Sequence, residues 1–145
     1  MEFIKPKYLN DLNVSDLQDF EQENQISLPK DYVDFLKKYN GGKPSLDFIK
    51  KNDIHVKWIY GMYDEYIWQN LFWTLDNYQN RIPDWYMPIG VDIADNILIQ
   101  SLYPDNKGLI ALWHHDGENI SSGSDYYENC TFVSDSFSDF VNMLS

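Results

Sequence analysis

The stretch LPKDYVDFLKKYNGG, residues 28–42, decides how this chain begins to fold. Its apolar residues recur at the spacing that lines one face of an α-helix, and that face consists of Tyr32, Phe35, Leu36 and Tyr39. Pro29 suits the first helical position, because its φ is already helical and its missing N–H would have no partner there. Gly41 suits the left-handed conformation that ends a helix, and Pro44 prevents the helix from resuming. We therefore predict a short helix with a buried face and sharp ends.

A first helix precedes this stretch. It is predicted from Ser15 to about Asn24, and a capping box of Ser15 and Gln18 opens it. Leu17 and Phe20 have the spacing of an inward face.

A strand and a third helix follow it. Alternation predicts a strand over residues 54–60, ended by Gly61. Helical spacing then returns over residues 64–79 and stops at Ile82 and Pro83, because a residue before proline avoids the helical region.

The second half of the sequence predicts an antiparallel meander of strands followed by a last helix. Three short β-prone runs are separated by turn-rich stretches, which favours consecutive antiparallel pairing; the runs span residues 87–91, 97–103 and 109–114. Residues 117–129 are polar and indicate a loop. A strand over 130–133 then precedes a helix with the inward residues Phe137, Phe140, Val141 and Leu144. We predict an α+β fold, a central antiparallel sheet packed by N-terminal, middle and C-terminal helices, as a single domain over residues 1–145.

Charge is distributed unevenly along the chain. The formal net charge is −12, and residues 58–145 hold thirteen acids against two basic groups, Arg81 and Lys107. After Lys107, six acids follow without any cation. Such a one-sided field argues against direct binding of nucleic acid or an anionic membrane, and it favours a basic protein as partner.

Cysteine usage and hydropathy indicate the compartment. The single cysteine, Cys130, excludes an internal disulfide and points to a reducing environment. The start MEFIKPKYL lacks the apolar run of a signal peptide, and no segment approaches transmembrane length. We therefore predict a soluble, cytoplasmic protein.

Catalytic and metal-binding patterns are weak. Cys130 has no local nucleophile motif around it. His114 and His115 would point to opposite faces of a strand, which separates the two imidazoles. Adjacent carboxylates such as Asp64 and Glu65 could do acid–base chemistry only in a cleft that a sequence cannot show. We predict no enzyme activity, no metal and no cofactor.

Three runs of the sequence carry a family signature. The first is NVSDLQDFEQENQISLPKDYVDFLKKYNGGKPS, with Leu-Pro, Asp-Tyr, Phe-Leu and Asn-Gly-Gly in order; the others are MPIGVDIADNILIQ and LIALWHHDGE. From about Val14 to Glu118 they resemble the SUKH superfamily, whose namesakes include the yeast Smi/Knr cell-wall regulator. One departure is Ala94-Asp95-Asn96, because family members commonly have Gly before the turn residue. Asp and Asn tolerate a left-handed conformation, so the turn can survive.

The resemblance implies a function. Bacterial members of the superfamily are regarded as immunity proteins that bind and neutralise a cognate polymorphic toxin, often a nuclease. A basic nuclease domain would complement the acidic charge, so the resemblance implies a non-enzymatic inhibitor that occupies the toxin's active surface. The residues expected to contact the toxin are Asp64, Glu65, Asp92, Asp95, Asp116 and Glu118, with Trp68 and Tyr63 as aromatic anchors.

Two other functional classes stay open. The eukaryotic namesakes imply a regulatory scaffold or adaptor that binds a signalling protein or peptide. An enzyme would show a deep pocket with converging polar groups, whereas an inhibitor would show a broad acidic face with protruding aromatics. The sequence leaves open the identity of the toxin, the face that binds it and the oligomeric state.

Overall fold

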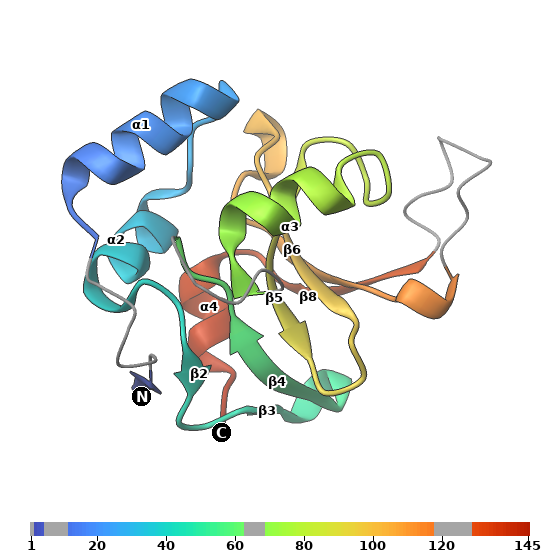
Figure 1. Ribbon diagram of the computed structural model, residues 1–145. Coiled ribbons are helices and arrows are strands. Elements are labelled where there is room, and N and C mark those ends of the chain that lie inside the picture. The colour runs from blue at the N-terminus through green and yellow to red at the C-terminus, as the bar shows by residue number, and fades with distance from the viewer. Residues whose placement is uncertain (1, 5–11, 63–68, 118–128) are drawn as a thin grey trace.

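The computed structural model describes residues 2–4, 12–62, 69–117 and 129–145 (Figure 1). The helices in these ranges are α1 (Val14–Asn24), α2 (Lys30–Tyr39), α3 (Leu71–Tyr78) and α4 (Phe137–Asn142). The strands are β1 (Phe3–Ile4), β2 (Lys43–Pro44), β3 (Phe48–Ile49), β4 (Ile54–Ile59), β5 (Tyr86–Asp92), β6 (Ile97–Ser101), β7 (Ile110–Trp113) and β8 (Cys130–Ser134). Among the described helices, none is long and apolar enough to cross a membrane.

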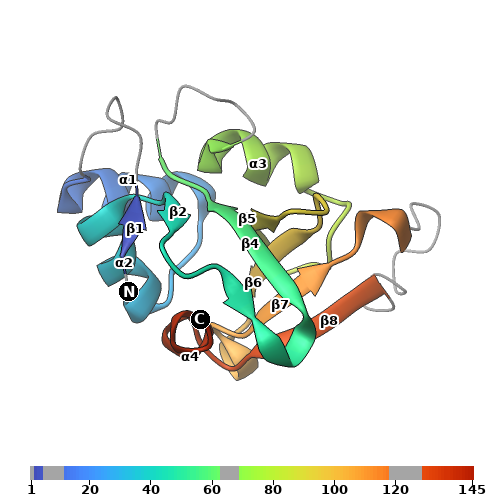
Figure 2. The same ribbon diagram turned by 90° about the horizontal axis from the view of Figure 1, so that it is seen from below.

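The main sheet is an antiparallel meander. Its order is β3-β4-β5-β6-β7-β8, so each strand pairs with its neighbour in the sequence. The predicted α+β class and consecutive pairing are confirmed. Ser145 exchanges backbone hydrogen bonds with Phe48 of β3, so the last residue of the chain extends the edge of the sheet. The short strands β1 and β2 pair separately, beside α2 (Figure 2).

The sheet buries side chains on both faces. Leu98 of β6 joins the main core, together with residues of α1, α2 and α4. Its neighbour Ile97 and Trp113 of β7 belong to a second, smaller cluster, to which Ile82 contributes and against which Tyr78 of α3 packs. In Figure 2, α1 and α2 lie together at one side of the sheet, while α3 and α4 lie above and below its strands.

Asn13, rather than Ser15, caps α1. Oδ1 of Asn13 accepts a hydrogen bond from the Asp16 N–H (2.9 Å), and Oδ2 of Asp16 accepts one from the Asn13 N–H (3.3 Å). The predicted capping box that starts at Ser15 is therefore wrong. Asn and Ser are about equally good caps, and the Ser15 hydroxyl here donates to Asn13 Oδ1 (2.6 Å). Leu17 and Phe20 are buried, as predicted.

The end of α2 is built around Asn40. Asn40, not Gly41, is the C-cap, with φ of 52°, and its N–H donates to the Leu36 carbonyl (2.8 Å). The buried Asn40 side chain pairs with the backbone of Met62: Nδ2 donates to the carbonyl (3.1 Å) and Oδ1 accepts from the N–H (2.9 Å). Gly41 follows with φ of 91°, where a Cβ would lie 2.7 Å from the Ile59 carbonyl oxygen. The Asn-Gly-Gly motif therefore docks the helix end onto β4 as well as ending the helix.

Two further helix starts differ from the prediction. Pro29 is the N-cap of α2, one position before its predicted place. Asn70 caps α3, since its Oδ1 accepts hydrogen bonds from the N–H groups of Phe72 (2.9 Å) and Trp73 (3.3 Å). Asn70 is extended, with φ of −87° and ψ of 122°, so the helix predicted over 64–79 does not run through it. Helical spacing alone does not reveal an internal cap of this kind.

Candidate functional site

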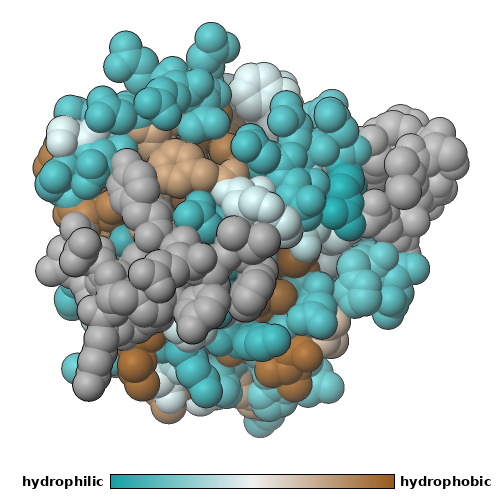
Figure 3. Space-filling view, viewed as in Figure 1, coloured by the Kyte–Doolittle hydropathy of each residue, from teal (hydrophilic) through white to brown (hydrophobic). Residues whose placement is uncertain are grey.

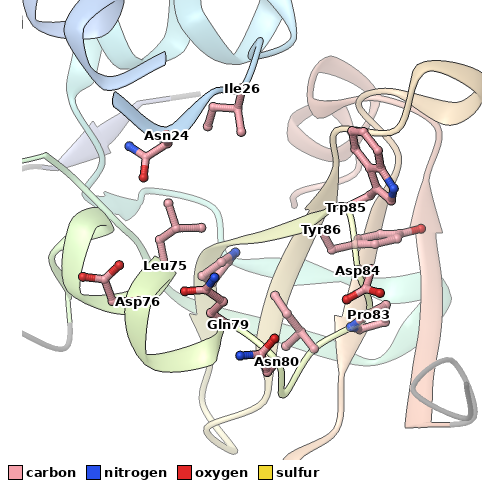
Figure 4. A pocket seen from close by; sticks show the side chains of 12 residues that line it. Asn24, Ile26, Leu75, Asp76, Gln79, Asn80, Pro83, Asp84, Trp85 and Tyr86 are labelled. Carbon is pink, nitrogen blue, oxygen red and sulfur yellow. The ribbon is translucent and has the colours of Figure 1, made fainter. Parts of the chain in front are cut away.

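A cavity of about 300 Å³ lies between the end of α1, α3 and the start of β5 (Figure 4). Ile26 borders it from the connection after α1, and Leu75 and Asp76 border it from α3. Asp84 and Trp85 border it from the turn before β5. Among the described residues that line this cavity, the charged ones are Asp76 and Asp84, and both are exposed. The cavity therefore combines apolar side chains with negative charge.

Trp85 lies beside this cavity in a strained backbone conformation. The Tyr86 N–H donates to the Pro83 carbonyl (3.2 Å), which closes a four-residue turn with Trp85 at its third position and φ of 70°. Gly or Asn usually occupies such a position, because a larger side chain in the left-handed region costs about 1–2 kcal/mol. The Trp85 carbonyl accepts a hydrogen bond from the Leu102 N–H (2.7 Å), which ties the turn to the chain that follows β6.

The Trp85 side chain is exposed despite its size. Its exposed fraction is 61%, and its ring meets that of Tyr103 edge-on with the centroids 5.5 Å apart. Tyr103 is itself exposed. A cation adjoins this pair, because Lys107 lines a neighbouring cavity with Trp85 and donates to Ser27 Oγ (2.8 Å). We define the Trp85 surface by Asp76, Asp84, Trp85 and Tyr103.

Two of the acids predicted to contact a partner reach the surface at the other end of β5. Asp95 lies in the β5–β6 turn with φ of 64°, and one of its oxygens is 3.8 Å from Lys57 Nζ. Asp116 follows β7, next to His115, whose Nε2 lies 3.0 Å from a carbonyl oxygen of the β5–β6 turn. The β5–β6 turn and the short segment that follows β7 are therefore adjacent. Since β5 has seven residues at about 3.4 Å each, this end lies roughly 20 Å from Trp85.

Asp92 holds the β5–β6 turn together. It is 5% exposed, and its Oδ1 accepts hydrogen bonds from the N–H groups of Ala94 (2.9 Å) and Asn96 (2.8 Å). Its carboxylate therefore offers a partner little surface. We define the acidic-turn surface by Asp95, Asp116 and the exposed Ile93. The other predicted contacts lie outside the described residues; they are Tyr63, Asp64, Glu65, Trp68 and Glu118.

In the described part of the chain, one pair of side chains capable of acid–base chemistry lies together, because His115 Nδ1 is 3.3 Å from Asp116 Oδ1. The described residues contain no group of three or more that could hold a metal ion. His114 Nε2 lies 2.7 Å from Thr131 Oγ1, whereas His115 contacts the β5–β6 turn, so the two imidazoles have different partners. The predicted reason is wrong, because β7 ends at Trp113 and His115 begins a short 3-10 helix. Burial raises the pKa of the Cys130 thiol to about 11. The neutral thiol is a poor nucleophile, so the environment of Cys130 does not favour catalysis.

Trp85 is not among the residues that the sequence predicts to contact a partner. The break at Ile82 and Pro83 predicts only the end of a helix. The usable signal is the order Pro83-Asp84-Trp85, because Pro and Asp favour a turn and a Trp that follows them lies outside any helical or strand period. Its backbone carbonyl also accepts a hydrogen bond from Leu102, a residue too far along the chain for a local pattern to reveal.

Comparison with known proteins gives a family match over nearly the whole chain. A family model described as SMI1 / KNR4 family (SUKH-1) matches residues 12–143. No curated protein and no solved structure matches the chain.

Proposed function

Because the chain belongs to the SMI1 / KNR4 family (SUKH-1), we propose that it is an immunity protein that binds and neutralises a cognate polymorphic toxin. This family is commonly associated with toxins and immunity, is generally non-catalytic and suggests a protein partner. The toxin is proposed to carry a basic nuclease domain. The net charge of −12 supports this choice, since a surface that holds phosphates is basic and an acidic inhibitor complements it.

The observation that carries the proposal is the exposed, strained Trp85. Backbone strain of this kind costs stability, and it concentrates at binding sites and ligand clamps. Trp is also among the residue types most enriched at interface hot spots. In the proposed complex, Trp85 enters a pocket of the toxin, Tyr103 supports its ring, and Asp76 and Asp84 meet basic groups. Binding would then cover the surface with which the toxin holds its substrate.

The coloured part of the face seen in Figure 3 offers a partner no broad apolar patch. Hydrophilic residues predominate over the coloured part of that face, and apolar ones show in small, separate areas. The acidic-turn surface stays a second proposed contact. A standard interface covers about 800 Å² per partner, which is roughly 28 Å across if square. One toxin would therefore reach both surfaces only if it lay along β5.

To test this proposal, partners of the tagged chain are captured from an extract of the cells that produce it and are eluted with increasing salt. Any basic toxin domain that elutes is then assayed for activity with and without added chain. Trp85→Gly is the decisive variant, because glycine accepts the positive φ. The relieved strain offsets the lost contact with Tyr103, so the free energy of unfolding should change by no more than about 1 kcal/mol. Toxin affinity should fall about 30-fold or more, which corresponds to a hot-spot loss of about 2 kcal/mol.

A matched control lies outside both surfaces. Val14→Ala removes an exposed apolar side chain at the start of α1 and should leave toxin affinity within about twofold of the parent. Charge reversal at Asp95 and Asp116 tests the acidic-turn surface in the same assay. If Trp85→Gly inhibits the toxin as well as the parent, the Trp85 surface is not the contact. If only acidic or neutral signalling proteins are captured, the immunity proposal is wrong and an adaptor is favoured.

A further inference from the structure

A second cavity, of about 270 Å³, has a lining that suits a cationic side chain. Its aromatic residues come from β4, the residue after β4 and α3; they are Trp58, Tyr60, Trp73 and Tyr78. Gln69, Asp95 and Lys57 supply its polar groups. Sites for drug-sized ligands usually measure about 300–1,000 Å³, so this cavity is better matched to a single side chain.

Two polar atoms of the lining residues have no hydrogen-bond partner within the described part of the chain. They are Nε1 of Trp58 and Oε1 of Gln69, and both atoms are buried. Native proteins pair most such atoms, so each unpaired one needs an explanation. Both atoms are shielded from solvent, so they lie behind the surface of the cavity, and an incoming residue reaches them only if the lining side chains move.

Asp95 supplies the negative group of this cavity, and Lys57 supplies a positive one. The Asp95 carboxylate lies 3.8 Å from Lys57 Nζ, and the two side chains are 75% and 59% exposed, so the ion pair is loose and well screened by water. The carboxylate nevertheless acts on one of the aromatic residues, Tyr60. Burial first, and then Tyr78 and Asp95, raise the pKa of the Tyr60 hydroxyl.

We propose that this cavity receives an arginine side chain of a protein partner. A cation over the face of Trp58 or Trp73 is attracted by the ring, and tryptophan is the strongest partner for such contacts. The planar guanidinium also carries five N–H donors, some of which can pair with the exposed carboxylate of Asp95. Arginine is favoured over lysine, because its weakly hydrated plane stacks on aromatic rings.

The chain itself contains an example of this contact. The guanidinium of Arg81 lies over the ring of Tyr78, 4.7 Å from its centroid, and 5.8 Å from the centroid of Trp113. Because Tyr78 already has this cation, Trp58 and Trp73 are the rings that a partner's arginine contacts. The site shares Asp95 with the acidic-turn surface, lies at the other end of β5 from Trp85, and does not require the partner to be a toxin. It therefore goes beyond the proposed function.

A blocked amino acid tests the site without any knowledge of the partner. The probe is N-acetyl-L-arginine amide, and the control is N-acetyl-L-citrulline amide, which has the same shape without the charge. Titration is followed by the NMR signals of the tryptophan indole N–H groups. We expect saturable shifts at Trp58 and Trp73 with the arginine probe and binding at least about fivefold weaker with citrulline. Equal binding of the two probes, or shifts confined to other tryptophans, overturns the proposal.

Two substitutions should move the affinity in opposite directions. Asp95→Asn removes the charge but tolerates φ of 64°, and it should weaken binding about two- to fivefold. Lys57→Met removes the competing cation and should tighten binding by a similar factor of about two to five. Both side chains are exposed, and unchanged urea midpoints confirm that the variants fold. Unchanged affinity in both variants overturns the proposal. Trp85→Gly should bind the probe like the parent, which separates this site from the Trp85 surface.

Discussion

Asn40 combines two roles that substitution can separate. Its side chain is 1% exposed and makes both hydrogen bonds to the backbone of Met62, while its own backbone is left-handed with φ of 52°. Asn40→Gly removes the two hydrogen bonds but accepts the backbone conformation without steric cost. Asn40→Ala removes the same bonds and adds the cost of a Cβ in the left-handed region.

The expected magnitudes follow from the groups left unpaired. Met62 is fully buried, so its N–H and its carbonyl each lose about 1–3 kcal/mol when the Asn40 side chain is absent. Asn40→Gly should therefore lower the free energy of unfolding by about 2–6 kcal/mol. Asn40→Ala should lower it by about 1–2 kcal/mol more. A domain with a total stability of about 5–15 kcal/mol will show either change clearly.

Urea unfolding followed by tryptophan fluorescence measures these changes, with the slope against denaturant checked for constancy. Gln25 provides the matched control, because it is the C-cap of α1, is exposed and has a left-handed φ of 55°. Gln25→Gly should raise the free energy of unfolding by about 1 kcal/mol. If Asn40→Gly costs less than about 1 kcal/mol while Gln25→Gly behaves as expected, the pairing with Met62 is not what holds α2 to β4.

Three further predictions concern stability. Gly41→Ala places a Cβ 2.7–2.8 Å from backbone atoms and should lower the free energy of unfolding by about 2–4 kcal/mol, as measured with urea. At Gly108 the nearest atom to a new Cβ is 3.8 Å away, so Gly108→Ala should lower it by only about 1–2 kcal/mol. Asp92→Ala removes the carboxylate that accepts the hydrogen bonds of the β5–β6 turn and should lower the free energy of unfolding by about 1–3 kcal/mol. An unchanged urea midpoint would contradict the role of Asp92 in holding this turn. Burial raises the pKa of the Cys130 thiol to about 11 and also that of the Tyr32 hydroxyl, from ordinary values of 9.0 and 10.0. Above pH 9 the unfolded chain therefore binds fewer protons than the fold, so the urea midpoint should fall as pH rises, and a rising midpoint would refute this.

Local patterns account for what the sequence predicted correctly. Leu17, Phe20, Phe137 and Phe140 are buried because helical spacing alone sets which face turns inward. The strands pair consecutively because turn-rich stretches separate the β-prone runs, and such turns favour antiparallel neighbours.

The features that the sequence predicted wrongly or missed depend on distant residues or on small differences in free energy. Asn40 and Met62 are 22 positions apart, and nothing near Asn40 in the sequence marks its partner. Asn13 and Ser15 are comparable caps, so the two possible helix starts differ little in free energy. A periodic pattern of apolar residues cannot resolve so small a difference. Trp85 belongs to no periodic face, and only its position in a closed turn distinguishes it from a packed aromatic residue.

The meander order also implies an order of folding. Contacts between consecutive strands close short loops, which is fast, whereas contacts between residues far apart in the chain must wait for longer loops to close. Phe48 and Ser145 are 97 positions apart, and Asp31 and Ser138, which are joined through the Asp31 carboxylate, are 107 positions apart. Both contacts should form late. Hydrogen bonds that form last and lie at an exposed edge are also the first to open, so the contact that extends the sheet at β3 is where we expect unfolding to begin.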